Sequence, residues 1–170
     1  MAEIDAVVTL AGKQKLIQMW GGLSAFEAIA TFKIGEGGWE AHPITAIRSP
    51  RSPDESLTDL DILEEVGRAA ANKRYMLGSG ENHGYFEKAL LPGDFAFVGP
   101  GTLEVTCDIT GGEYNTENTG VLIYDDGGPY VVPSMYEIGL FDAGGVMVAY
   151  GTFPKQQVAA TTNVVRIKVA

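Results

Sequence analysis

The sequence has few of the residues that form cross-links or reactive centres. Cys107 is the only cysteine among 170 residues, and there are only two histidines. A single cysteine excludes an intramolecular disulfide and a cluster of thiolate ligands within one chain, which fits folding in a reducing cytoplasm. Long apolar runs are also missing, since no segment approaches the roughly 20 continuous apolar residues that span a bilayer. The sequence therefore predicts no membrane segment.

Basic residues are scarce as well. The chain has 12 Lys and Arg against 22 Asp and Glu, a formal net charge of -10. Phosphate backbones and anionic lipids are bound by concentrated basic surfaces, so the composition argues against nucleic acid and membranes as partners. An acidic surface suits a soluble protein or one that docks onto a basic partner. The start, MAEIDAVVTLAG, has acidic residues where a signal peptide has basic ones, so we expect a soluble chain that is made in the cytosol.

Helical patterns occur in the N-terminal half of the chain. Thr9 is a suitable N-cap for a helix through Trp20, which the pair Gly21-Gly22 would end. A second helix is predicted over residues 56–71, where acidic residues come early and basic residues late, as the helix dipole favours. Residues 40–56 contain three prolines and no sustained period, which predicts a loop.

Most other periodic segments have the pattern of strands. Candidates lie at residues 28–34, 94–98, 103–109, 120–124 and 164–170, and a hairpin is predicted over 135–153. Alternation over residues 103–109 places Cys107 on the core face as a small apolar residue. These elements predict an α+β fold, with short N-terminal helices packed on a mainly antiparallel β-sheet or sandwich.

Motifs that carry chemistry are missing or incomplete. The stretch GSGENHG (residues 78–84) does not have the glycine spacing of a dinucleotide site, and Pro92-Gly93 interrupts any helix after it. His83 with Glu81 and Glu87 is an ordinary loop arrangement, without the helical HExxH spacing of a zinc site. We therefore expect no catalytic residues, no metal and no cofactor. An enzyme that uses Glu81 and His83 is the least favoured hypothesis.

Several residues are candidate contacts for a partner. Trp39, after the GEGG turn, is suited to stacking on a sugar, to anchoring a protein, or to covering the edge of the core. The other candidates are basic residues in an acidic protein: Arg48 and Arg51 between two Ser-Pro pairs, and Arg166 and Lys168 in the final strand. Ordinary surface charges are the alternative for these four. Exposed strand edges, the final strand included, suit strand addition to a neighbour.

The predicted hairpin also carries a specific resemblance. YEIGLFDAGGVMVAYGTFP resembles the segment of the phage tail-collar fibre family that reads Glu-(Ile/Val)-Gly-Leu-Phe-Asp, a glycine turn, a short apolar strand, a glycine and a proline. The matching positions are Glu137, Ile138, Gly139, Leu140, Phe141, Asp142, Gly144 or Gly145, Gly151 and Pro154. VTLAGKQKLI, FKIGEGGW and LTDLDILEEVGR are similar to three further segments of that family, in the same order. The resemblance covers about residues 5–154.

This resemblance implies a structural role. In that family the domain is the baseplate-proximal part of a tail fibre, which it joins to the virion, and no catalytic residues belong to it. We expect residues 1–154 to form such a domain, with a variable insert at about 78–119, and residues 155–170 to be a connection and a final strand. The expected partners are other tail and baseplate proteins and fibre subunits, in a homo-oligomer located in the virion after synthesis in the host cytoplasm.

Two forms of this function remain open. Family members usually continue into a fibrous shaft, whereas this sequence stops soon after the domain, which favours an adaptor between fibre and baseplate. The alternative is a carbohydrate-binding, host-receptor module of a tail fibre that uses Trp39 and Tyr85 as stacking platforms.

Overall fold

β-Strands dominate the chain. The computed structural model describes residues 2–35, 37–45, 47–61, 76–77, 82–83, 85–109, 134–157 and 161–168. Within these ranges the structure contains one long helix, α1 (Leu10–Trp20), and a short 3-10 turn, η2 (Pro92–Asp94). The strands are β1 (Ala2–Val8), β2 (Ile29–Gly35), β3 (Trp39–Ala41), β4 (Arg48–Pro50), β5 (Met76–Leu77), β6 (Asn82–His83), β7 (Tyr85–Ala89), β8 (Phe95–Gly99), β9 (Thr102–Ile109), β10 (Ser134–Asp142), β11 (Met147–Gln157) and β12 (Thr161–Lys168).

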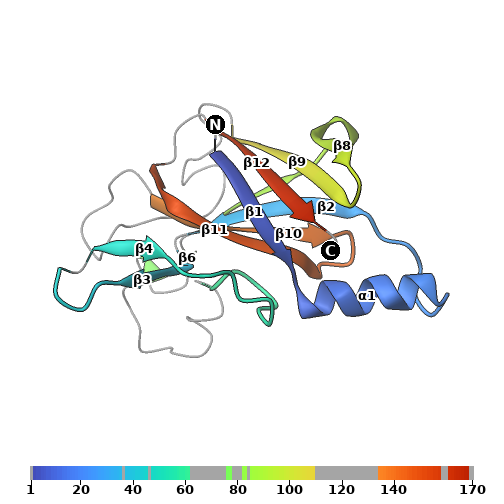
Figure 1. The fold of residues 1–170 in the computed structure, drawn as a ribbon, viewed down its shortest axis with the longest axis horizontal. Helices are drawn as coiled ribbons and strands as arrows, with labels where there is room; N and C mark the ends of the chain where they lie inside the picture. The colour runs from blue at the N-terminus through green and yellow to red at the C-terminus, as the bar shows by residue number, and fades with distance from the viewer. Residues whose placement is uncertain are drawn as a thin grey trace.

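Eight of the strands form one sheet. Their order is β7-β2-β10-β11-β1-β12-β9-β8, and all neighbours are antiparallel except β1 and β12, which run parallel. The sheet curls into a half-barrel (Figure 1). Its two edge strands, β7 and β8, are consecutive in the chain, and Lys88 of β7 donates a hydrogen bond to the carbonyl oxygen of Asp108 on β9 at 3.0 Å. The curl therefore brings opposite sides of the sheet together.

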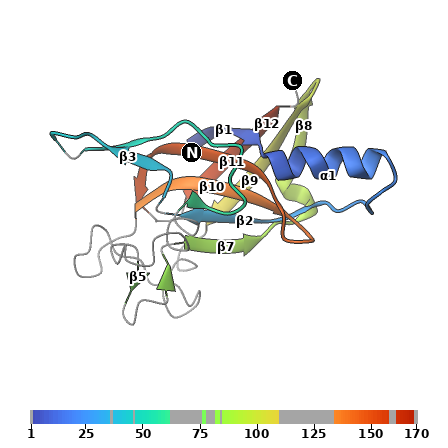
Figure 2. The same ribbon diagram turned by 90° about the horizontal axis from the view of Figure 1, so that it is seen from below.

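The α+β prediction is wrong. The described part of the chain is mostly β, and α1 lies at one end of the curled sheet instead of covering a face, with the β3–β4 hairpin at the opposite end (Figures 1 and 2). The prediction overlooked β1, where buried Ile4 and Ala6 alternate with exposed Glu3 and Asp5. The predicted helix over residues 56–71 lies largely outside the described residues; residues 56–60 contain a turn and a bend and are not helical, whereas Asp61 is helical.

Two further predictions need correction. Residues 40–56 are not only a loop, because they contain most of β3 and all of β4, which pair with each other. Trp39, the first residue of β3, is buried. The final strand is not a free edge: β12 lies between β1 and β9, and Val165 is fully buried. Its backbone groups are already used by two neighbours, so strand addition to a partner at β12 is excluded.

Other elements are where the sequence placed them. The N-cap at Thr9, the end of α1 near Gly21, the strands at 29–35, 95–99 and 102–109 and the hairpin of β10 and β11 are confirmed. Cys107 is fully buried, as its place in the alternation predicted. The strand expected at residues 120–124 lies outside the described residues.

The core has two parts on opposite faces of the sheet. Inside the curl, side chains from β1, β2, β7, β9, β10, β11 and β12 pack together, including Phe32, Ile138 and Val165. A second cluster packs on the outer face of β10 and β11: Trp39, Leu57, Leu60, Tyr136, Phe141, Met147 and Tyr150. β10 is therefore buried on both faces, which explains why EIGLF has an almost continuous apolar run rather than a polar-apolar alternation.

Candidate functional site

Glu137 is the centre of a buried polar cluster. It lies on β10 and is fully buried, yet it has three hydrogen-bond donors around its carboxylate. Oε1 accepts from Gly37 N–H at 3.0 Å, and Oε2 accepts from Asp61 N–H at 2.8 Å and from the Tyr150 hydroxyl at 2.7 Å. These bonds join the hairpin to the GEGG turn and to the segment that follows β4. The first acidic residue of the EIGLFD motif thus connects three chain segments.

Asp61 and Arg51 complete this cluster. Asp61 Oδ2 accepts from Gly38 N–H at 3.2 Å and forms an ion pair with the Arg51 guanidinium. Burial raises the pKa of Tyr150 far above its ordinary value, and the nearby charge of Glu137 raises it further. Tyr150 therefore remains a neutral hydrogen-bond donor at any physiological pH. The hydrogen bonds and the ion pair of this cluster fix three chain segments to one another.

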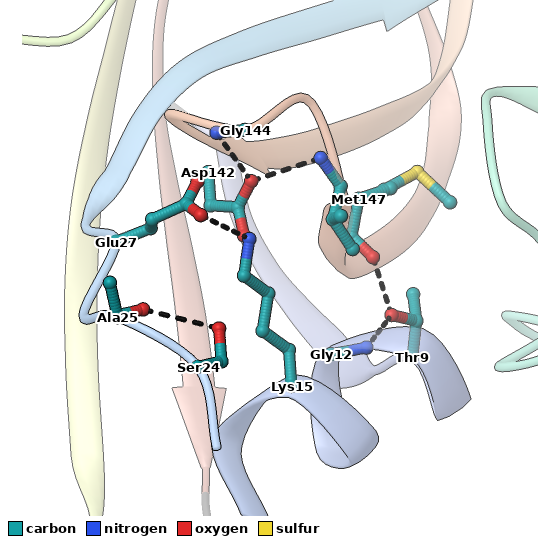
Figure 3. A network of polar contacts seen from close by, with 10 residues as sticks. Thr9, Gly12, Lys15, Ser24, Ala25, Glu27, Asp142, Gly144 and Met147 are labelled. Carbon is teal, nitrogen blue, oxygen red and sulfur yellow. Dashed lines mark hydrogen bonds and ion pairs between the residues drawn. The ribbon is translucent and has the colours of Figure 1, made fainter. Parts of the chain in front are cut away.

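Asp142, the last residue of the motif, is the centre of a second polar cluster (Figure 3). Its Oδ1 accepts from Gly144 N–H at 2.9 Å and from Val146 N–H at 3.0 Å, which fixes the turn between β10 and β11. Its Oδ2 lies 2.6 Å from Lys15 Nζ, and Glu27 Oε1 lies 3.1 Å from the same nitrogen. The ammonium group of α1 is thus held between two carboxylates, one from the hairpin and one from the segment before β2.

Thr9 attaches the start of α1 to the same hairpin (Figure 3). Its hydroxyl accepts from Gly12 N–H at 2.9 Å as an N-cap and also donates to the carbonyl oxygen of Met147. Its own N–H donates to the carbonyl oxygen of Val148 at 3.0 Å. Thr9 is fully buried, so these bonds satisfy a polar group that would otherwise be costly to bury.

The remaining motif positions serve close packing. A Cβ at Gly139 would lie 2.8 Å from Met147 Sδ, and a Cβ at Gly151 would lie 2.7 Å from Ile4 Cγ2. Gly145 has a φ of 85°, the left-handed conformation that the hairpin turn needs. Leu140 and Phe141 are buried in the two cores. Pro154 follows them on β11 and is exposed.

An apolar groove lies between α1 and the adjacent end of the curled sheet. It consists of two adjoining cavities of about 310 and 610 Å³, which share Leu16, Glu27, Ile29 and Leu103 in their walls. The smaller one is also lined by Met19 of α1 and by Phe97 of β8, and the larger one by Phe26 and by the connection from β7 to β8. Lys15, Glu27 and Asp142 are the charged side chains in these walls.

Exposed apolar side chains gather around this groove. Large apolar residues on α1, on the loop after it and on the β7–β8 region are widely exposed, and Trp20, Leu23, Phe26 and Phe97 are all at least 75% exposed. The other exposed large apolar residues within the described ranges are Ile44 and Ile47, on the β3–β4 hairpin at the opposite end of the molecule (Figure 2). The groove end is thus the larger apolar surface of the described part, a feature typical of an interaction site.

The predicted contact residues do not all lie on one exposed surface. Trp39 is only 8% exposed and packs against Tyr136 with ring centroids 6.3 Å apart. Arg51 pairs with Asp61, and Arg166 pairs with Glu3 and Glu104 at 2.9 Å each. Arg48 and Lys168 lie on β4 and β12, but their side chains, like those of Glu81, His83 and Tyr85, lie outside the described part. Trp39 and Arg51 thus lie close together at the β3–β4 hairpin, where Trp39 pairs with Pro50 and Arg51 N–H donates to Gly38 O, whereas Arg166 lies on β12, a strand of the large sheet.

Sequence reasoning missed the groove. Its walls come from α1, from η2 and from strands β1, β2, β8, β9, β10, β11 and β12, so only the tertiary fold assembles it. A signal was nevertheless present: Ile17, Trp20, Leu23 and Phe26 are more apolar residues than one helix face and its loop can bury.

Replacing Lys15 with methionine tests the second cluster. The hydrogen bond to Asp142 raises the pKa of Lys15 above its ordinary value of 10.5, more than burial lowers it. Because the folded-state pKa is the higher one, the stabilisation is complete below pH 10.5 and is lost as the pH rises through the folded-state pKa. Lys15→Met should therefore lower Tm at neutral pH, and the difference from the wild type should shrink in thermal melts above about pH 10.5.

Lys13→Met is the matched control for this measurement. Lys13 pairs with Glu55 on the surface, where both side chains are about half exposed. Such a pair contributes little, so the control should melt close to the wild type at every pH. Equal effects of the two substitutions, or a Lys15→Met difference that persists unchanged at high pH, would contradict the assigned role of the Lys15 pair.

Within the described residues, no group of three His, Cys, Asp or Glu side chains lies close enough to hold a metal ion. No helix in these ranges combines the length and the hydrophobicity needed to cross a bilayer. Comparison of the chain with protein-family models, with curated proteins and with solved structures found no match.

Proposed function

We propose that this protein is a structural component of a phage tail, a fibre protein or an adaptor that attaches fibres to the baseplate. One observation carries the proposal: the hairpin side chains that match the tail-collar motif bind the other segments that share the resemblance. Glu137 binds Gly37 of FKIGEGGW and Asp61 of LTDLDI, and Asp142 binds Lys15 of VTLAGKQKLI. Four motifs that are separate in the sequence thus form one rigid module.

A rigid module of this kind suits attachment. Its two carboxylate clusters fix loops and helix to the sheet, so that surfaces at its two ends keep a constant relative position. An adaptor must transmit load between partners without unfolding, and buried, fully bonded polar clusters favour one unique arrangement. The proposed partners are tail and baseplate proteins and fibre subunits, with the chain itself in a homo-oligomer within the virion.

The carbohydrate-binding alternative needs two exposed aromatic side chains, and one of them, Trp39, is buried. Trp39 would have to stack on a sugar ring with an open face, whereas its side chain is buried against Tyr136. No other feature of the described residues favours a sugar site.

The proposal predicts that the chain is present in mature virions. Mass spectrometry of phage particles purified through a density gradient should detect it in amounts comparable with other baseplate proteins, and antibody labelling should place it at the periphery of the baseplate. An abundant capsid protein serves as the positive control, and a phage-encoded replication protein as the negative control. If the chain is absent from purified particles, or is removed with the replication protein, the proposed function is wrong.

A further inference from the structure

We propose that the groove between α1 and the sheet binds a segment of another protein that is apolar and carries a lysine or arginine. This deepens the proposed function, on which it rests, by naming the kind of partner that the module attaches. The groove is lined mostly by apolar side chains, among them the widely exposed Phe26 and Phe97, and the exposed Trp20 ends α1, the helix that forms one wall. Burying such residues is the main source of affinity in protein interfaces.

The charged side chains in the groove favour a partner segment that carries a positive charge. Lys15 is held between Asp142 and Glu27, so one ammonium group faces two carboxylates and the cluster has an excess negative charge (Figure 3). The side chain of Asp142 is only 2% exposed, whereas that of Glu27 is 31% exposed. Glu27 also lines both cavities. Glu27 is therefore placed to receive a cation from a bound segment.

The rest of the molecule favours the same sign. Six lysines and arginines have side chains that the structure describes, and each is already bound to a carboxylate or to a backbone carbonyl: Lys13, Lys15, Lys33, Arg51, Lys88 and Arg166. The chain as a whole carries a formal net charge of -10. Its long-range field therefore attracts basic partners and repels acidic ones.

The same charges disfavour the other occupants of an apolar groove. Two copies joined through their grooves would bring together the same excess carboxylate from each, so the proposed homo-oligomer would form at another surface. A fatty acid or anionic lipid would need a free cation for its headgroup, whereas Lys15 is already bound to two carboxylates. An apolar segment with one basic residue satisfies both the walls and the charge.

The test uses three matched sets of fluorescently labelled peptides of about ten residues. All carry the same apolar residues, and the central position is Lys or Arg in the first set, Gln in the second and Glu in the third. Fluorescence anisotropy with the full chain should show that the Lys/Arg set binds about tenfold more tightly than the Glu set.

Two variants test the residues of the groove. Glu27→Gln should reduce the preference for the Lys/Arg set over the Gln set. The double substitution Phe26→Ser and Phe97→Ser should weaken binding of every set about tenfold or more.

Ile44→Ser with Ile47→Ser is the control for exposed apolar surface. These residues are 88% and 67% exposed, similar to Phe26 and Phe97 at 81% and 76%, but they lie on the β3–β4 hairpin. This control should bind every peptide set as the wild type does. Folding of each variant is checked with Cys107, whose burial raises its thiol pKa and keeps it from reacting with a thiol reagent unless the core opens.

Several results would overturn the inference. These are equal binding of the Lys/Arg and Glu sets, equal loss of binding in the Ile44/Ile47 control, or self-association in sedimentation that Phe97→Ser abolishes. Virion analysis separates this inference from the proposed function. A Phe26/Phe97 variant that fails to bind peptides but is incorporated normally refutes the groove as the attachment site alone. Peptide binding by a chain that is absent from virions refutes the proposed function alone.

Discussion

Replacing Glu137 with alanine is expected to lower the free energy of unfolding by about 3–5 kcal/mol, the range for removing one member of a buried charged cluster. The substitution leaves the N–H groups of Gly37 and Asp61 and the hydroxyl of Tyr150 without their acceptor. All of these donors belong to buried residues, so solvent can replace the lost hydrogen bonds only if the structure opens. Urea unfolding followed by circular dichroism measures the change.

Two further variants make this result interpretable. Glu137→Gln keeps the shape and one acceptor oxygen but places an NH₂ donor among donors, so we expect an intermediate loss of about 1–3 kcal/mol. Glu55→Ala removes a carboxylate whose side chain is 48% exposed and which pairs with Lys13, so the change should stay within about 0.5 kcal/mol. If Glu137→Ala unfolds at the same urea concentration as Glu55→Ala, Glu137 does not join these segments.

The sequence predicted elements that depend on nearby residues. The start of α1 follows from Thr9 and its end from Gly21, and the hairpin turn follows from Gly145, whose φ of 85° few other residues adopt. Cys107 was placed on the core face by a simple alternation along β9. Each of these features is decided within a few residues, so the printed sequence was sufficient.

Features that depend on contacts between residues far apart in the sequence could not be predicted from local patterns. β1 is a strand because it lies between β11 and β12, and β12 comes from the other end of the chain. The same distance hides ion pairs: Arg166 pairs with Glu3, 163 positions away, and the sequence does not show which basic residues have such a remote partner. The groove, with walls from α1, η2 and seven strands, was hidden for the same reason.

Gly12→Ala is the second substitution for which we expect a large change in stability. Two opposing contributions to the free energy of unfolding decide its sign. Alanine in place of glycine inside a helix is favourable by about 1 kcal/mol. A Cβ at Gly12, however, would lie 2.6 Å from the carbonyl oxygen of Val148 and 2.8 Å from its Cα. These are backbone atoms of β11, so no side chain can rotate away, and α1 must move from the sheet or β11 must distort. Overpacking of this kind costs about 1–3 kcal/mol, and here the rigid contact favours the upper end of that range.

The net expectation is therefore a loss of about 1–2 kcal/mol in the free energy of unfolding, opposite in sign to the helix propensity. Gly21→Ala is the matched control, because Gly21 has a φ of -80° and its nearest neighbour for a Cβ is 3.5 Å away, so it should be neutral. Gly12 and Lys15 both line the groove, and a displaced α1 would change the spacing of its walls. Gly12→Ala should accordingly weaken binding of the Lys/Arg peptides, while Gly21→Ala should not. A Gly12→Ala protein that is more stable than the wild type would show that α1 is not held against β11 at this contact.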